Sequence, residues 1–481
     1  MTRGAKLIVA VAILSVGACG SAVYKVASLQ QVPSRPEQLQ LAAPHLFKAA
    51  RPIETHIRNV LVAELLPSED APLMHLSMLI RMGSRWDPPS KAGLAYITAD
   101  TLLKGGTMEL PGVRFQEELE RYGAILRIEP SDDAVSFNLS ALKVTFRDSC
   151  KLLVQLLTDP AYPENNIEVA KTAQLDHLAR RNDNIQAVLV RNFWQLLFGR
   201  ESPYARQPSS KSIGAITRED VIKFHSRYVV PENAVIGITG DFDVPKMEAE
   251  LTDVFRPWKA GGKPKPTPPS WAGLKKEHAG IYLINRPAAE AWFLIGRVGD
   301  TKEDNKYPAL MVMNAVFGSG LNSRLVRTVR SEHGLSYAIG SQWNAGWDRP
   351  GVFTIMGGTK PQSVVESLRL IKTEIDKMRS EPITDDEFNR ARRAIGQSIL
   401  ADFDSPTKTL QFYTRISFFD YPLNYIEWYQ QKLFGLTKKE VQGLVNYYFN
   451  FSQFIVIVIG DEQSFGTPLS SFGPVVHLAG E

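Results

Sequence analysis

Hydrophobic and polar residues alternate in short stretches of this chain and recur with a helical period in longer ones. The alternation covers 75–81 and 133–139, which predicts half-buried β-strands there. Helical periodicity covers the stretches 92–103 and 113–122, and longer ones near 164–182 and 385–402. Strands and helices mixed in this order predict an α+β fold in which helices pack on a mixed sheet.

One supersecondary unit occurs twice along the chain. In the first copy Thr217 is positioned to cap a helix, and the buried strand that follows stops at Gly240. In the second copy Thr437 and Gly460 hold the same places, and 23 residues separate the threonine from the glycine in both copies. The repeat predicts an internal duplication, with two homologous halves that each contain a mixed β-sheet covered by helices.

Changes in composition divide the chain into segments. Four prolines between Lys259 and Ser270, with lysines among them, indicate an extended linker between the halves. The predicted segments are a signal peptide (1–19), a tether (20–50), an N-terminal domain (51–258), a Pro-rich linker (259–274), a C-terminal domain (275–465) and a tail (466–481).

The N-terminus is typical of an exported lipoprotein. Two cations precede an apolar run over 7–16, which is too short to span a bilayer, and Gly17, Ala18 and Cys19 follow it. This ending resembles a bacterial lipobox, so Cys19 is the expected lipidation site. The alternative is an ordinary signal peptide cleaved near Ala18. The lipid anchor would hold the chain on a membrane facing the periplasm, and Gly20 after the cysteine favours the outer membrane.

Charge argues against one class of partner. The chain has 55 Lys and Arg against 51 Asp and Glu, a net charge of +4, and no long basic run. Nucleic acid is therefore not an expected partner. After Cys19, Cys150 is the other cysteine of the sequence, and a buried structural thiol is its expected role.

The segment from Gly83 to Thr107 resembles the active-site helix of insulinase and pitrilysin-type zinc peptidases. Gly83-Ser-Arg85, then Gly-Leu-Ala95, then Lys104-Gly-Gly-Thr107 match the residues that flank the family's inverted zinc motif, His-x-x-Glu-His. The loop from Ser202 to Pro208 is similar to the family's His-Pro-Tyr-Gly loop. The resemblance covers about 55–462 and implies the fold of LuxS and the processing peptidases.

The motif between these flanks is replaced. In the family, two histidines one helical turn apart bind zinc, the glutamate between them is the general base, and a later glutamate is the third ligand. By resemblance, Tyr96 and Asp100 occupy the histidine positions, Ala99 the base position, and His177 the position of the third ligand. No zinc site is therefore expected. An unusual metal site formed by Tyr96, Asp100 and His177 is one alternative, and a hydrogen-bonded polar cluster of these residues is the other.

A second resemblance lies in the other half. Arg330 and Tyr337, seven residues apart within Arg330-Ser-Glu-His-Gly-Leu-Ser-Tyr337, match the pair with which the family holds the substrate backbone. A guanidinium and a phenol can both donate hydrogen bonds to a peptide carbonyl. The alternative is that Arg330 caps a helix and Tyr337 packs in the core.

The resemblance implies a function in the two-chain, processing-peptidase-like branch of this family. There, one chain carries the zinc motif, and an inactive partner supplies the Arg/Tyr pair and half of a closed chamber for peptides. We therefore expect a non-catalytic, substrate-binding subunit with no cofactor of its own, whose zinc lies in a paralogous partner. A lipid-anchored scaffold or binding protein of the same fold, with no proteolytic role, is the alternative.

Overall fold

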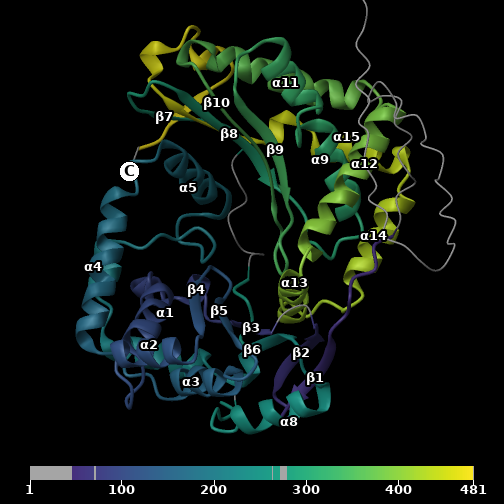
Figure 1. The fold of residues 1–481 in the computed structure, drawn as a ribbon. Helices are drawn as coiled ribbons and strands as arrows, with labels where there is room; N and C mark the ends of the chain where they lie inside the picture. The colour runs from purple at the N-terminus through teal and green to yellow at the C-terminus, as the bar shows by residue number, and fades with distance from the viewer. Residues whose placement is uncertain (1–45, 70–71, 263, 271–278, 480–481) are drawn as a thin grey trace, which may run out of the picture. The chain divides into compact units, whose positions relative to one another are not determined.

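The computed structural model describes residues 46–69, 72–262, 264–270 and 279–479 (Figure 1). The predicted signal peptide, nearly all of the tether and the lipidation site Cys19 lie outside these residues. We call residues 46–258 the N-terminal half and 279–479 the C-terminal half. The strands are β1 Ile53–Ile57, β2 Leu61–Pro67, β3 Leu73–Ile80, β4 Ile125–Pro130, β5 Val135–Leu142, β6 Ala234–Gly240, β7 Gly280–Asn285, β8 Ala291–Val298, β9 Ala338–Asn344, β10 Val352–Thr359, β11 Ile455–Gly460 and β12 Val475–His477.

The helices follow the periodicity of the sequence closely. The helices are α1 Leu94–Gly105, α2 Gly112–Arg121, α3 Phe146–Thr158, α4 Glu164–Arg180, α5 Ile185–Phe198, α6 Ser210–Gly214, α7 Arg218–Tyr228, α8 Val244–Val254, α9 Tyr307–Phe317, α10 Arg324–Val326, α11 Val364–Ser380, α12 Asp385–Leu400, α13 Pro406–Phe418, α14 Tyr425–Gly435 and α15 Lys438–Tyr448. Both predicted caps are present. The side chains of Thr217 and Thr437 accept hydrogen bonds from the backbone amides of Asp220 and Glu440, whose side chains in turn accept from the threonine amides, as in a capping box.

Each half contains one six-stranded mixed sheet, and the two sheets share one strand order. The N-terminal sheet runs β1-β2-β6-β3-β5-β4, and the C-terminal sheet runs β12-β7-β11-β8-β10-β9. In both sheets, the strand that ends at the repeated glycine pairs in parallel with one neighbour and antiparallel with the other. This strand is β6 in the N-terminal sheet and β11 in the C-terminal sheet. The predicted α+β fold with two homologous mixed-sheet halves is confirmed.

The outer strand differs between the sheets. β1 forms an antiparallel hairpin with β2, whereas β12 pairs in parallel with β7. β12 lies in the segment that the sequence predicted to be a tail. Its three residues are too few for an alternation of hydrophobic and polar residues to indicate a strand. At the other end, Phe47 of the expected tether donates its amide to Gln430 Oε1 at 2.7 Å, so the chain is already packed there.

The halves exchange one helix each. α5 follows the N-terminal half's helices but packs on β8 and β11 of the C-terminal sheet, and α13 packs on β2, β3 and β6 of the N-terminal sheet (Figure 1). Two strand glycines let these helices approach. A Cβ on Gly296 would lie 2.6 Å from Phe193 Cζ of α5, and one on Gly237 would lie 2.2 Å from Thr414 Oγ1 of α13. The exchange places apolar surface of each half inside the core of the other.

Buried charges also join the halves. Arg85, from the recognised Gly-Ser-Arg segment, is buried and forms ion pairs with Asp133 at 3.0 Å and Asp348 at 2.7 Å. Arg349 pairs with the same Asp133 at 2.7 Å. The contacts run from Asp348 to Arg85, Asp133 and Arg349 in that order. Charges of opposite sign therefore lie next to one another along the network. Arg85 therefore has a structural role in joining the halves, which its place in a motif did not reveal.

The pKa of Glu64 predicts a pH-dependent stability. Glu64 is buried on β2, accepts a hydrogen bond from Ser417 Oγ of α13 at 2.5 Å, and burial raises its pKa to about 7. The folded state thus binds this proton more tightly than the unfolded state. Its contribution is complete below the unfolded pKa and is lost as the pH rises through 7, by about 3 kcal/mol at most.

We therefore expect Glu64→Gln to flatten the fall in the free energy of unfolding between about pH 4.5 and 7, the interval between the unfolded and folded pKa values of this carboxyl. Urea unfolding at several pH values measures this, with Glu129→Gln, on the exposed side of β4, as the control. A slope unchanged by Glu64→Gln would show that Glu64 is ionised in the fold throughout this range.

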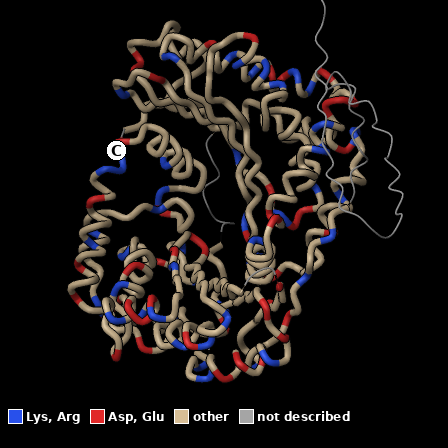
Figure 2. The backbone as a smooth tube through the Cα atoms, in the orientation of Figure 1, with Lys and Arg blue, Asp and Glu red and all other residues tan. Residues whose placement is uncertain are grey.

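Two further properties concern the surface and the membrane. Basic and acidic residues are interspersed along the chain, as Figure 2 shows. Among the described residues, no helix combines the length and the apolar character needed to cross a bilayer.

Candidate functional site: a replaced zinc helix and an exposed Arg/Tyr pair

Helix α1 begins where the family resemblance is closest. Gly93 occupies the position before the helix with φ 106°, a left-handed conformation that favours glycine. The carboxylate of Asp87 accepts the amides of Gly93 at 2.8 Å and Ala95 at 2.9 Å, so it caps the helix from outside. Burial raises the pKa of Asp87 to about 7, although these two amides favour the ionised form. Sequence reasoning missed Asp87, because an acid seven residues before the helix matches no local cap pattern.

The four positions that correspond to the zinc site do not converge. Tyr96 on α1 and His177 on α4 line one cavity of about 690 Å³, and burial raises the pKa of the Tyr96 hydroxyl. Asp100 instead forms an ion pair with Lys104, one turn further along α1, at 2.6 Å. Ala99 is buried in the N-terminal core. The structure thus brings together Tyr96 and His177, without Asp100 or Ala99.

The residues present do not fit a zinc ion. Structural and catalytic zinc sites need at least three nitrogen, sulfur or carboxylate ligands. Within the described parts of the chain, no group of three such residues could hold a metal, and His177 has no hydrogen bond to Tyr96 or Asp100. Tyr96, Asp100 and His177 are thus not joined by hydrogen bonds, and Asp100 does not line the cavity with the other two. Ala99 also has no group that could take a proton from water.

The intact scaffold predicts that zinc binding can be restored. α1 packs against α4, and Tyr96 and His177 already face one cavity. Tyr96→His, Asp100→His and His177→Glu together should supply the missing ligand set, and we expect about one zinc per chain by metal analysis. Adding Ala99→Glu supplies the base. The unaltered chain is the control, and a triple variant that folds without zinc would show that the helices are misplaced for the metal.

The Arg/Tyr pair lies on the C-terminal half. Arg330 belongs to a one-turn π-helix over Arg327–Glu332, which continues α10, and Tyr337 directly precedes β9. The Arg330 guanidinium lies over the Tyr337 ring, 4.7 Å from its centroid. Tyr337 is 85% exposed, so it does not pack in the core. The sequence spacing thus brings the two residues together, with Tyr337 exposed and Arg330 half-buried beside it.

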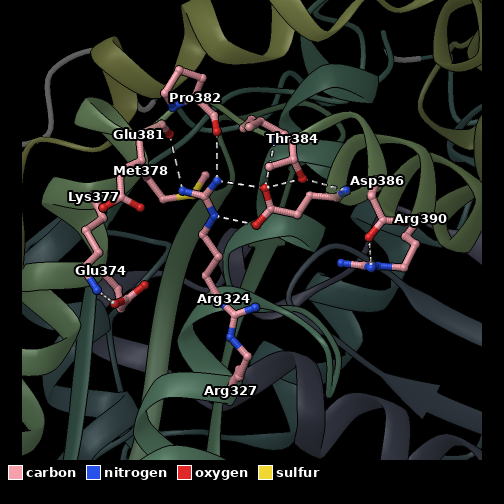
Figure 3. A network of polar contacts seen from close by, with 12 residues as sticks. Arg324, Arg327, Glu374, Lys377, Met378, Glu381, Pro382, Thr384, Asp386 and Arg390 are labelled. Atoms are coloured by element: carbon pink, nitrogen blue, oxygen red, sulfur yellow. Dashed lines mark hydrogen bonds and ion pairs between the residues drawn. The ribbon is translucent and has the colours of Figure 1, made fainter.

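A buried ion pair anchors the segment that carries Arg330. Arg324 donates through Nε and Nη2 to the two carboxylate oxygens of Glu387 at 2.7 and 2.8 Å. It also reaches the carbonyl oxygens of Glu381 and Pro382, as Figure 3 shows. This arrangement lowers the pKa of Glu387 to about 2. The acidic partner of Arg324 is 63 residues away, where no local sequence pattern could reveal it.

The loop over Ser202–Pro208 connects to the replaced zinc helix. Arg206 donates from Nη2 to the backbone oxygen of Asp87 at 2.6 Å, and Arg206 lines the cavity with Tyr96 and His177. The Arg349 guanidinium lies over the ring of Tyr204 at 4.8 Å. The resemblance of this loop therefore has a structural basis, because the loop holds the beginning of α1.

Together, the duplicated fold and the replaced zinc helix define a class of protein: a zinc-peptidase scaffold without its metal site. Comparisons identify the family. A model described as "Insulinase (Peptidase family M16)" matches residues 65–202, and one described as "Peptidase M16 inactive domain" matches residues 215–395. The chain belongs to the insulinase family of peptidases, M16.

Similar proteins include peptidases and a non-peptidase. A protein of Rickettsia bellii named "Uncharacterized zinc protease" is 23% identical over 67% of this chain and 77% of its own length. The "Non-peptidase homolog YmxG" of Helicobacter pylori is 21% identical over 82% of this chain and 90% of its own. A crystal structure of a peptidase M16 inactive domain from Pseudomonas fluorescens superposes with a TM-score of 0.76 at 21% identity, over 87% of this chain and 99% of that one. A protease structure from Helicobacter pylori matches with the same TM-score at 19% identity, over 86% of this chain and 100% of that one.

The replaced residues lie within the stretch that the insulinase model matches, the inactive-domain model matches residues 215–395, and one similar protein is named a non-peptidase. This chain is an inactive member of the family, without zinc-dependent catalysis of its own.

Proposed function

We propose that the chain is the substrate-binding, non-catalytic subunit of a heteromeric zinc peptidase. The observation that carries this proposal is the contact of Arg330 with the exposed Tyr337 ring. An exposed tyrosine held by a cation contributes little to folding, whereas two donors on one surface can hold a peptide backbone without reading its sequence. A buried ion pair keeps this segment in place even though the zinc positions are replaced.

In the proposed complex the zinc and the general base come from a paralogous partner. This chain supplies Arg330 and Tyr337, and half of a closed chamber for peptides. Several similar proteins are named zinc proteases, which makes a zinc-carrying relative a reasonable partner. The backbone grip would orient the scissile peptide against the partner's metal, and orientation of this kind contributes substantially to the rate.

Co-purification tests the proposed assembly. The chain, tagged and truncated before residue 46, is co-expressed with each family member from the same genome that carries His-x-x-Glu-His. We expect one of them to co-purify in stoichiometric amount and to hydrolyse peptides in the complex. A chain that stays alone with every such relative would support the scaffold function and contradict the proposal.

We further propose that Cys19 carries the lipid that holds the chain on a membrane facing the periplasm. Two acyl chains on one residue suffice for stable anchoring. Cys19→Ala is expected to move the protein from the membrane fraction to the soluble fraction and to abolish labelling by a radioactive fatty acid. Cys150→Ala is the matched control, since Cys150 is buried. Equal labelling of wild type and Cys19→Ala would contradict this proposal.

A further inference from the structure

The cavity beside the replaced zinc positions has an unusual lining. Besides Tyr96 and His177 it is lined by four arginines, which are Arg180, Arg181, Arg191 and Arg206. Its volume of about 690 Å³ is within the range of ligand pockets, but such pockets are mostly apolar. A cavity lined by four guanidinium groups therefore points to a ligand of opposite charge.

The arginines come from three segments that meet at this cavity. Arg180 and Arg181 lie at the end of α4, Arg191 lies on α5, and Arg206 lies on the loop that holds α1. Arg191 donates to the backbone oxygen of Arg181 at 3.2 Å and to Asn182 Oδ1 at 2.5 Å, so it braces the turn between α4 and α5. The cations therefore surround the cavity and do not form a single exposed helix face.

The acidic residues at the cavity leave much of this charge uncompensated. Asp87 and Asp132 also line it, but the carboxylate of Asp87 is used by the amides of Gly93 and Ala95. Asp132 accepts the hydroxyl of Ser84 at 2.8 Å. Within the described residues, no ion pair joins Arg180, Arg181 or Arg206 to a carboxylate, whereas helical cations such as Lys104, Lys151, Lys223 and Lys408 each have one.

The like charges also affect one another. Burial and the charge of Arg181 both lower the pKa of Arg191, and burial lowers that of Arg206, which the charges of Asp87 and Glu201 offset only in part. Each cation would therefore gain from an anion placed between them. Guanidinium groups match carboxylates with two parallel hydrogen bonds, and the hydroxyl of Tyr96 and the imidazole of His177 can donate beside them.

We propose that this cavity binds the carboxylate side chains of an acidic peptide segment, so that the chain selects substrates rich in Asp and Glu. The inference rests on the proposed function and names its substrate class. A peptide fits better than a small anion, because the cations come from separate segments around a volume far larger than one carboxylate. Among the lining residues, Tyr96 and His177 are the aromatic rings, too few for the stacking platform on which successive bases of single-stranded nucleic acid rest.

Fluorescence anisotropy tests the proposal on the full mature chain carrying Cys19→Ala. The probes are a labelled peptide with glutamate at alternate positions and the same peptide with glutamine there. We expect the glutamate peptide to bind at least about tenfold more tightly. Its affinity should fall on addition of salt, because salt screens partly exposed charges.

Three variants locate the site. Arg180→Gln/Arg181→Gln is expected to weaken binding of the glutamate peptide about tenfold, and Arg180→Lys/Arg181→Lys, which keeps the charge, should recover part of this loss. Arg114→Gln/Arg127→Gln removes two exposed arginines elsewhere on the same half and is the matched control. Thermal unfolding checks that all variants are folded.

Two outcomes would overturn the proposal: equal binding of the two peptides, or an equal loss in the Arg114/Arg127 control. These measurements need no partner chain, so they test this inference separately from the proposed function. Binding through Arg180 and Arg181, together with failure of every zinc-carrying relative to co-purify with this chain, would contradict only the proposed function. A complex with Arg330-dependent activity but no preference for acidic peptides would contradict only this inference.

Discussion

Replacing Arg330 by alanine is expected to lower the kcat/KM of the reconstituted peptidase about tenfold to hundredfold. A charge-assisted hydrogen bond contributes roughly 1.5–3 kcal/mol, and about 1.4 kcal/mol corresponds to a tenfold change in rate. The variant also frees the Tyr337 ring from the cation that lies over it. Tyr337→Phe keeps this contact and removes only the hydroxyl donor, so its effect should be smaller than that of Arg330→Ala.

Arg327 offers a matched control for Arg330. It lies one turn earlier on the same π-helical segment, is exposed and pairs with Glu332 at 3.4 Å. Arg327→Ala removes the same type of side chain without touching the pair, and it should leave kcat/KM within about twofold. Equal losses in Arg327→Ala and Arg330→Ala would show that general surface charge, and not the pair, acts on the substrate.

Replacing Arg324 by methionine is expected to lower the free energy of unfolding by about 3–5 kcal/mol. The side chains of Arg324 and Glu387 are 7% and 14% exposed, and removal of one partner leaves a buried charge uncompensated. Glu387 ordinarily stabilises the fold above the unfolded pKa of a glutamate, and this contribution is lost as the pH falls towards its folded pKa of about 2. Arg324→Met should remove this acid dependence, which urea unfolding at pH 3 and 7 measures.

Two further variants test the cause of that loss. Arg324→Met/Glu387→Gln leaves no buried charge and keeps a side-chain oxygen that accepts the Thr384 amide, so we expect it to recover a large part of the lost stability. Arg390→Ala breaks an exposed ion pair with Asp386 on the same helix and should cost less than about 0.5 kcal/mol. A double variant as unstable as Arg324→Met would show that packing, and not the uncompensated charge, dominates.

Much of the fold could be predicted from the sequence, because the determining signals are local. The strand alternation near His75 and the helical periods predicted the elements, and the Thr217 and Thr437 caps predicted the duplication. The exchange of α5 and α13 could not be predicted in this way. It depends on the space left by Gly237 and Gly296, and on which sheet each helix meets after the chain has folded.

The candidate site was predicted only in part, for a similar reason. Resemblance placed Tyr96, Ala99, Asp100 and His177 at the replaced zinc positions, but it did not show that Asp100 turns to Lys104. The cation-lined cavity also escaped the sequence, since its arginines are spread over three segments and form no run. Asp87 is another example, because its partners are amides that any residue could provide.

The most direct test of the central claim is a titration of the zinc-carrying partner with this chain, followed by the rate of peptide hydrolysis. We expect a rate that is low for either chain alone and rises until the two are equimolar. The Arg330→Ala chain should bind the partner equally well and reach a much lower plateau. Full activity of the partner alone, unchanged by either form of this chain, would contradict the proposed function.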